Sequence, residues 1–265
     1  MINILELKSI SAGYKNSVSK GKNGSRTGKV VLGGIDLSVC EGELLVLAGP
    51  NGSGKSTLLK TAGGLIPPLK GRVMINGKDI NKIKARERAS LTAFLFQVRD
   101  SPWPFTVRET VAQGRFARQG WFGVENKKDR EVISGALEKT GLIDFAERPI
   151  IELSGGELQR VYIARCIAQE AAFLLLDEPE NNLDPKYSFM ILSLLSELVR
   201  EGCGAIVSLH DLRLASYFAS RIALLSLTGV GGKISAIGTP IEVLTPENLS
   251  KVYNLNDDLV RRLIL

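Results

Sequence analysis

The chain has 265 residues, of which 44% are hydrophobic and 23% are charged, and its formal net charge is +6 at pH 7. These fractions are typical of a globular protein, and the length suits one α/β domain with an insertion. No apolar run approaches the roughly 20 residues that span a bilayer, and residues 1–6 lack the layout of a signal peptide. We therefore expect a soluble, cytosolic chain.

Three cysteines, Cys40, Cys166 and Cys203, are scattered along the chain with no paired spacing. An odd, sparse set of this kind indicates reduced thiols in apolar surroundings rather than a disulfide framework or a zinc site. We therefore expect the three cysteines to be free thiols.

The chain begins with strand patterns that are separated by a long loop. Residues 2–10 alternate weakly between apolar and polar side chains, which predicts an edge strand. Residues 15–29, the basic loop, are rich in Gly, Ser, Asn and Lys and are expected to be flexible. The positive charge concentrated there favours a solvated loop over a site for nucleic acid or anionic lipid by about three to one. Residues 30–32 and 35–39 resume the strand pattern.

The apolar run at residues 44–48 leads directly into the nonapeptide Gly49-Pro50-Asn51-Gly52-Ser53-Gly54-Lys55-Ser56-Thr57. This P-loop (residues 49–57) has two glycines five residues apart, then a lysine and a hydroxyl residue. Glycines let backbone N–H groups approach phosphate oxygens, Lys55 supplies positive charge, and the Ser56 hydroxyl can ligate Mg²⁺. A helix is expected to start near Ser53 and to end at Gly63-Gly64. The pattern predicts a nucleoside triphosphate site rather than a glycine-rich turn without a ligand.

Strand patterns then flank a helical stretch. Residues 71–77 alternate and end at Asn76-Gly77, which predicts a strand and a tight turn, and residues 91–97 indicate a short buried strand. Helices are expected in residues 98–152, with a capping box formed by Thr106 and Glu109. An apolar stripe that Gly141 closes consists of Val132, Ile133, Ala136 and Leu137.

Two later runs, residues 173–176 and 205–209, are continuously apolar. Strands covered by helices on both faces have this composition. The sequence therefore predicts an α/β core that is interrupted by a helical insertion.

Two adjacent carboxylates, Asp177 and Glu178, follow the first of these apolar strands. Asp177 is placed to hold Mg²⁺, directly or through water, and Glu178 to polarise a water for attack on a γ-phosphate. An isolated Asp-Glu pair is usually a solvated turn. Its position after an apolar strand and downstream of a P-loop favours the functional interpretation.

Residues 153–160 have the sequence Leu-Ser-Gly-Gly-Glu-Leu-Gln-Arg. Ser154 is a good N-cap and Glu157 completes a capping box, so a plain helix start accounts for these two residues. Gly155 and Gly156 in the first turn cost about 1 kcal/mol each in helix propensity. Glycines at these positions are explained if free N–H groups must approach an incoming anion closely.

The P-loop, residues 153–160, the strand that ends in Asp177-Glu178, and His210 together resemble the ABC transporter ATPase subunits, and the resemblance covers essentially the whole chain. It implies an α/β fold, with a P-loop NTPase (RecA-like) core, an N-terminal antiparallel β-subdomain and an inserted α-helical subdomain. The implied bounds are residues 1–97 and 166–265 for the core with its β-subdomain, and residues 98–165 for the helical subdomain. The resemblance also implies ATP and Mg²⁺ as cofactors and ATP hydrolysis as the activity.

By the same resemblance, three further residues face the nucleotide. Tyr14 looks like the aromatic residue that stacks on adenine, although the basic loop separates it widely from the P-loop. Gln97 looks like the glutamine between the core and the helical subdomain, which is both a catalytic residue and a metal ligand. His210, the only histidine, would contact the γ-phosphate; outside this context a lone histidine at a strand end is more often incidental.

The resemblance also implies a homodimer in which two copies share each nucleotide. Ser154, Gly155 and Gly156 would bind the γ-phosphate held by the other copy's P-loop. Residues 182–184, which end at Asp184, would form the loop that crosses the dimer interface. Glu180 and Asn182 depart from the Thr and Ala that are usual in the family, but neither stands at a phosphate or metal position.

Residues 106–115, 210–212 and 245–253 look like the iron-siderophore, haem and cobalamin importer ATPases. This implies integral-membrane permease subunits as partners, indirectly a substrate-binding protein, and a peripheral location on the cytoplasmic face of the cell membrane; no nucleic acid is expected. Residues 101–124 would form much of the surface that contacts the permease. Aromatic and basic residues gather there, namely Trp103, Phe105, Phe116, Trp121, Phe122, Arg108, Arg115 and Arg118. A subdomain core is the alternative explanation for about half of the aromatics.

Several other functions are compatible with parts of the sequence. One is another ABC system, either a metal-ion importer or an exporter. A second is a nucleic-acid-linked ABC ATPase, which only the positive charge supports. A third is a P-loop kinase, which would not need residues 154–156. Residues 126–129, Asn-Lys-Lys-Asp, also match the guanine-reading pattern of GTPases. That pattern should close a buried strand, whereas here it opens a charged helix, so a solvated helix face is predicted.

Overall fold

The computed structural model of the chain describes residues 3–14, 29–96, 104–119, 124–229 and 231–256. It divides into two compact units, one formed by Met1–Ile83 with Ser208–Leu265 and the other by Lys84–Val207. The second unit includes more residues than the helical insertion expected at residues 98–165, because the strand at residues 92–95 packs with the helices. The bounds 98–165 for a helical subdomain stay a prediction. Among the described residues, no helix has the length and apolar character needed to cross a membrane.

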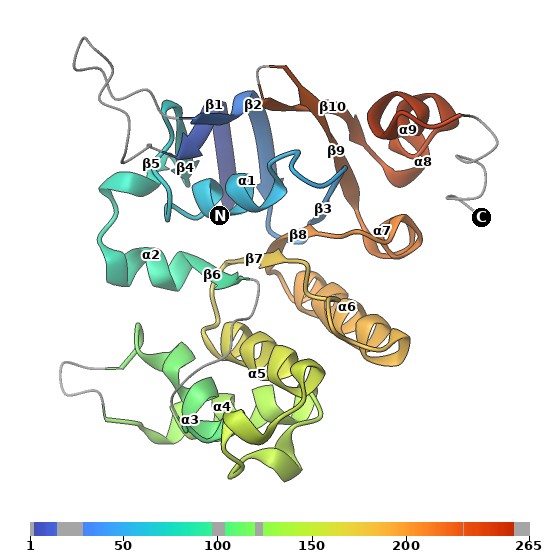
Figure 1. The fold of residues 1–265 in the computed structure, drawn as a ribbon. Helices are drawn as coiled ribbons and strands as arrows, with labels where there is room; N and C mark the ends of the chain where they lie inside the picture. The colour runs from blue at the N-terminus through green and yellow to red at the C-terminus, as the bar shows by residue number, and fades with distance from the viewer. Residues whose placement is uncertain (1–2, 15–28, 97–103, 120–123, 230, 257–265) are drawn as a thin grey trace. The chain divides into compact units, whose positions relative to one another are not determined.

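The first unit is built on a sheet (Figure 1). Its strands are β1 (Ile4–Tyr14), β2 (Lys29–Cys40), β3 (Leu44–Ala48), β4 (Lys70–Ile75), β5 (Lys78–Asp79), β9 (Arg221–Thr228) and β10 (Gly231–Gly238). Their order is β5-β4-β1-β2-β10-β9-β3. The pairs β1–β2, β1–β4 and β4–β5 are antiparallel, whereas β3 is parallel to β9. The predicted N-terminal antiparallel β-subdomain is therefore confirmed.

One strand prediction in this unit was wrong, and another was confirmed. β1 is not an edge strand, because it pairs with β2 on one side and with β4 on the other. Its alternation is weak because the register shifts after Leu7 and Lys8, where Ser9 has a φ of +50°. Residues 30–32 and 35–39 form one strand, β2, since the chain passes through Gly34 with a φ of +66° without leaving the sheet.

Helices and one correctly predicted turn complete the first unit. α1 (Lys55–Ala62) packs against β1 and β2, and α8 (Pro240–Val243) and α9 (Pro246–Tyr253) pack against β9 and β10 (Figure 1). The unit also contains α7 (Leu212–Phe218) and the 3₁₀ helix η1 (Ile80–Lys82). The predicted turn between β4 and β5 is present, with φ values of +51° at Asn76 and +76° at Gly77.

The second unit combines three strands with a group of helices. Its strands β6 (Thr92–Leu95), β7 (Phe173–Asp177) and β8 (Gly204–Ser208) have the order β8-β7-β6. Every residue of β7 and β8 is buried, as their continuous apolar runs predict. The helices are α2 (Ala85–Leu91), α3 (Val107–Ala112), α4 (Lys127–Lys139), α5 (Gly155–Ala168) and α6 (Pro185–Arg200), with the 3₁₀ helices η2 (Gln113–Arg115), η3 (Ile143–Phe145) and η4 (Ile150–Glu152).

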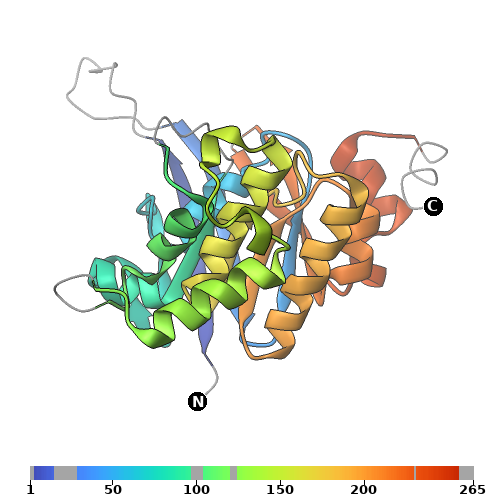
Figure 2. The ribbon, with the colours of Figure 1, turned by 90° about the horizontal axis from the view of Figure 1, so that it is seen from below.

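The helices α3, α4 and α5 pack around one apolar core (Figure 2). The predicted stripe supplies part of it, because Ile133, Ala136 and Leu137 are buried in this cluster. Thr106 and Glu109 form the predicted capping box of α3. Gly141 has a φ of +65° just beyond α4, as its predicted role at the end of the stripe requires.

A buried ion pair, Arg115 with Asp129, ties α4 to the end of η2. The two side chains are each 2% exposed, and Arg115 Nε donates to Asp129 Oδ1 at 2.9 Å. Arg115 Nη1 also donates to the Ala168 carbonyl and to Glu170 Oε2, both at 2.7 Å. The prediction that Arg115 belongs to an exposed basic patch is therefore wrong. The prediction that Asp129 lies on a solvated helix face is wrong for the same reason. Sequence periodicity did not reveal the pair because its partners come from separate elements.

The Cys166 side chain is buried in α5, where its Sγ lies 3.0 Å from the Phe94 carbonyl. Burial raises the pKa of this thiol to about 11, and the nearby Arg165 only partly opposes this. We expect Cys166 to resist alkylation by a maleimide at pH 7.5 in the native protein, because the thiolate is the reactive form. All three cysteines should react in denaturant. Mass spectrometry of labelled peptides checks this, and rapid native labelling of Cys166 would contradict it.

Candidate functional site

The P-loop connects β3 to α1 within the first unit. Gly49, directly after β3, has a φ of +140°, and a Cβ built there would lie 2.3 Å from the Leu225 carbonyl oxygen. Gly54 has a φ of +99° and forms the N-cap of α1. Both positions therefore require glycine, which lets the P-loop backbone turn between strand and helix. The helix begins at Lys55, close to the predicted start near Ser53, because Gly54 is in the left-handed region.

The start of α1 has the chemistry of an anion site. No side-chain oxygen caps the first turn, and no acidic residue lies in it. Lys55 is 5% exposed, and its Nζ donates to the carbonyls of Gly49 at 2.7 Å and Pro50 at 3.3 Å, which holds the ammonium group over the loop. In the described part of the chain, the buried Ser53 hydroxyl has no hydrogen-bond partner. Uncapped N–H groups, a buried cation and an unsatisfied hydroxyl fit a phosphate group.

Tyr14 stands at the end of β1, against the first turn of α1. Its hydroxyl lies 3.4 Å from the Thr57 Oγ1, and the side chain is 47% exposed. Tyr14 pairs with Lys29 across β1 and β2, so residues 15–28 leave and rejoin the sheet at one place. The length of the basic loop therefore does not move Tyr14 away from the P-loop, which was the objection that the sequence raised.

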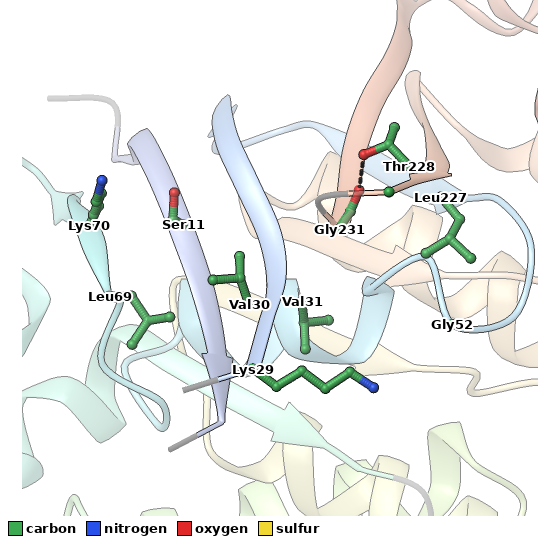
Figure 3. Close-up of a pocket in the computed structure, with 11 residues that line it drawn as sticks. Ser11, Lys29, Val30, Val31, Gly52, Leu69, Lys70, Leu227, Thr228 and Gly231 are labelled. Carbon is green, nitrogen blue, oxygen red and sulfur yellow. Dashed lines mark hydrogen bonds between the residues drawn. The ribbon is translucent and has the colours of Figure 1, made fainter. Parts of the chain in front are cut away.

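A hollow of about 1030 Å³ opens beside the P-loop at Gly52 (Figure 3). Apolar side chains form much of its lining, among them Val30, Val31 and Leu227. Lys29 adds positive charge, and Figure 3 shows its side chain running below Val31. An apolar hollow beside a phosphate cradle suits the base and sugar of a nucleotide. The sequence placed Lys29 in the flexible basic loop, but it is the first residue of β2, and the β1–β2 register sets it opposite Tyr14.

His210 is exposed in the first unit, two residues after β8. The next residue, Asp211, caps α7, since its Oδ1 accepts from the backbone N–H groups of Arg213 at 2.8 Å and Leu214 at 3.3 Å. The cap fixes the backbone direction immediately after His210. The imidazole is thus presented from a short segment between a buried strand and a capped helix.

The two predicted carboxylates lie in the second unit, where the chain leaves β7. Asp177 is the last residue of the strand and is 7% exposed. Glu178 has a φ of +52°, a conformation that residues other than glycine rarely adopt. Asn181 donates from its Nδ2 to Glu178 Oε2, and its backbone N–H donates to the Glu178 carbonyl at 3.1 Å. The chain therefore turns sharply at Glu178, directly after the end of β7.

Ser154 caps α5 in the same unit. Its Oγ accepts from the Glu157 N–H at 3.3 Å, and its N–H donates to Glu157 Oε2 at 2.8 Å, so the predicted capping box is confirmed. The hydrogen bonds from the Ser154 backbone and hydroxyl outweigh burial and lower the pKa of Glu157. Ser154 and Gly155 are exposed, which leaves the first-turn N–H groups accessible.

Packing also explains why residue 156 is a glycine, in addition to the predicted close approach of an anion. A Cβ built at Gly156 would lie 2.9 Å from the Asn182 carbonyl oxygen, whereas the nearest atom to one at Gly155 is at 3.8 Å. The first turn of α5 therefore lies directly against the loop after Glu178. Asp184 ends that loop and caps α6, accepting from the Tyr187 N–H at 3.0 Å.

Some predicted site residues are not placed by the structure. Gln97 lies outside the described residues. Ser56 and Asp177 belong to different units, so their joint ligation of Mg²⁺ stays a prediction. A hydroxyl and a carboxylate are oxygen donors that suit Mg²⁺, whose further ligands in such sites are water and nucleotide phosphates.

Comparison with known proteins defines the family. The ABC transporter family model matches residues 32–181, which is more than half of the chain. The chain belongs to the ABC transporter family. It is 40% identical over 247 residues to the iron(3+)-hydroxamate import ATP-binding protein FhuC of Bacillus subtilis, which covers 92% of this chain and 90% of FhuC. It is 41% identical over 227 residues to the hemin import ATP-binding protein HmuV of Streptomyces coelicolor, covering 86% of this chain and 79% of HmuV.

A solved structure supports the same assignment. The dimeric, post-hydrolysis structure of the ATP-binding cassette MJ0796, bound to ADP and Pi, matches with a TM-score of 0.75 and 28% identity, over 89% of this chain and 98% of that chain. The P-loop NTPase fold predicted from the sequence is therefore confirmed. As an ABC-type ATPase, the chain binds and hydrolyses ATP, which identifies the nucleoside triphosphate predicted from the P-loop.

Two residues that contact the turn at Glu178 could not be identified from the sequence. Asn181 contacts the Glu178 carboxylate, and Gln159 donates from Nε2 to the Pro179 carbonyl at 3.2 Å. Gln159 belongs to the stretch that carried the family resemblance, but nothing in the sequence indicated that its side chain turns toward Glu178 of its own chain.

Proposed function

We propose that the chain is the ATP-hydrolysing subunit of an ABC importer that powers uptake of a metal chelate, of the iron-siderophore, haem or cobalamin type, through a separate permease. The observation that carries the proposal is the similarity to an iron(3+)-hydroxamate import ATP-binding protein over nearly the whole chain. The hemin import relative supports the same class of cargo. The ATPase itself does not touch the chelate, which the permease and a substrate-binding protein would handle.

In this proposal two copies of the chain enclose two ATP molecules, in keeping with the dimeric cassette that it resembles. The P-loop N–H groups and Lys55 hold the phosphates, and Tyr14 stacks on the adenine. Ser56 and Asp177, with Gln97, would hold Mg²⁺. When bound, Mg²⁺ supplies positive charge that neutralises the phosphate oxygens.

Hydrolysis needs a group that activates water. Glu178 accepts a proton from a water whose oxygen forms the new bond to the γ-phosphorus, while the bond from that phosphorus to the leaving oxygen of ADP breaks. His210 contacts the γ-phosphate. Residues 154–156 of the other copy bind the same phosphate through the backbone N–H groups of Gly155 and Gly156, which the Ser154–Glu157 capping box does not use, and Asp184 lies in the loop that crosses the interface.

The permease would bind the helical part of the second unit from the cytoplasmic side of the membrane. Phe116 is 65% exposed there, and Phe105 and Val124 are also exposed. Exposed aromatic residues of this kind are typical of interface patches. Trp103, Trp121 and Phe122, which were predicted for the same surface, lie outside the described residues. Arg115 is removed from this surface by its burial against Asp129.

Mixing two inactive variants tests whether the site is shared between copies. Lys55→Ala removes the phosphate cation, and Ser154→Arg blocks the start of α5, so each variant alone should lose nearly all ATPase activity. A mixed dimer regains one intact site, made of the P-loop of one copy and residues 154–156 of the other. We therefore expect phosphate release to recover when the two purified variants are mixed. No recovery, despite mixed dimers detected by native mass spectrometry, would refute the shared site.

A further inference from the structure

Helix α5 holds the turn that carries Glu178 in its own chain. This carboxylate turn (residues 177–183) and α5 both lie in the second unit. Gln159, in the second turn of α5 and 2% exposed, points its Nε2 at two successive carbonyl oxygens, of Pro179 at 3.2 Å and of Glu178 at 3.5 Å. The first is a normal hydrogen bond and the second is at the limit of one.

The same turn is held at two further places. The first turn of α5 lies against it at Gly156, where a Cβ would come within 2.9 Å of the Asn182 carbonyl oxygen. Asn181 donates its side-chain amide to the Glu178 carboxylate and its backbone N–H to the Glu178 carbonyl. These contacts matter because Glu178 has a φ of +52°, and surrounding contacts must maintain a conformation of this kind.

We propose that Gln159 and Asn181 are positioning residues for Glu178, and that α5 thereby links two ATP sites. The N-terminus of α5 meets the nucleotide of the other copy, and five residues later the same helix holds the carboxylate that serves its own copy. A shift of α5 on nucleotide binding therefore reorients Glu178. The inference rests on the proposed function in two respects, namely that Glu178 activates the attacking water and that residues 154–156 meet the nucleotide of the other copy.

The substitution Gln159→Met tests this, because it keeps the length of a buried side chain and removes the amide donor. We expect kcat for ATP hydrolysis to fall by about tenfold, the effect of losing one buried hydrogen bond at a reacting group, while the Kd for a fluorescent ATP analogue stays within about twofold. A purely structural role would change stability or nucleotide affinity along with kcat.

Gln169 provides a matched control at the C-terminal end of the same helix. Its Nε2 donates to the carbonyls of Ala89 at 2.5 Å and Thr92 at 2.9 Å, so Gln169→Met removes the same kind of contact away from the carboxylate turn. We expect its kcat to be near that of the native protein. Equal losses of kcat in both variants would overturn the inference, as would a raised Kd with an unchanged kcat in Gln159→Met.

A double variant separates this inference from the proposed function. In a Glu178→Gln background, Gln159→Met should lower the residual turnover no further, because the residue acts only through Glu178. Additive losses would refute the inference alone. If Glu178→Gln itself retained turnover, the assigned role of Glu178 would fail first. If Gln159→Met does not fold, kcat and Kd are compared instead for Asn181→Ala, which changes a partly exposed position.

Discussion

Replacing Glu178 with Gln is expected to leave ATP binding intact and to reduce steady-state hydrolysis by about 100-fold or more. The amide keeps the shape and the contact with Asn181 but cannot accept a proton from water. Lys55 and the start of α1, which hold the phosphates in the proposed site, lie in the other unit and are unchanged. The measurements are phosphate release at saturating ATP and the Kd of a fluorescent ATP analogue.

Glu180→Gln, two residues along the same turn, is the control for removing a negative charge from this region. Its turnover should remain close to that of the native chain. With ATP bound and hydrolysis blocked, the Glu178→Gln protein should also accumulate as a dimer in light scattering. Near-normal turnover in Glu178→Gln would remove the basis for assigning Glu178 as the base.

Replacing Arg115 with Met is expected to lower the free energy of unfolding by about 3–5 kcal/mol, because it leaves a buried carboxylate without its partner. Asp129 and Arg115 are each 2% exposed, and Arg115 also holds the Ala168 carbonyl at the end of α5. Unfolding in urea, followed by circular dichroism, measures the loss. Glu125→Gln, which removes the charge of a partly exposed partner of Arg108, should cost less than about 1 kcal/mol.

The double variant Arg115→Met with Asp129→Asn separates the charge from the packing. Neutralising Asp129 removes the buried charge and preserves the side-chain shape that contacts Asn126, so stability should partly recover. A double variant as unstable as Arg115→Met would show that the lost contacts to Ala168 and Glu170 dominate.

Acid should weaken the same ion pair in the native protein. Burial alone would raise the pKa of Asp129, but the hydrogen bonds from Arg115 and from the Asn126 backbone outweigh it and lower the pKa below the ordinary 3.8. A lowered pKa in the folded state means that the stabilisation is complete above 3.8 and is lost as the pH falls through the lower folded value. Asp129→Asn should lack this part of the acid dependence.

Several features of both units could be predicted because their signals are local. The P-loop, the turn at Asn76-Gly77 and the capping box at Ser154 each depend on residues only a few positions apart. Residue types in such short segments determine backbone conformation directly, through positive φ at glycine or a side-chain cap. The family resemblance added the proposal that two copies of the chain share each nucleotide site.

Contacts between distant segments could not be predicted in this way. Residues 2–10 were predicted to be an edge strand because nothing in their sequence indicated that they pair with two neighbouring strands, β2 and β4. Arg115 looked like a surface cation because its partners, Asp129 and Glu170, come from other elements. A charged residue type in the sequence does not indicate whether the fold will bury that side chain.

The sequence by itself determined that this chain has a phosphate-binding loop, two carboxylates after a buried strand, and a capped helix start at Ser154, because each depends on short-range chemistry. Only the tertiary structure decided which side chains from distant parts of the sequence contact these segments. It placed Tyr14 against Thr57 in spite of the basic loop, and it turned Gln159 toward the carbonyls of the carboxylate turn. These placements arise from strand register and helix packing, which bring together residues that no local pattern connects.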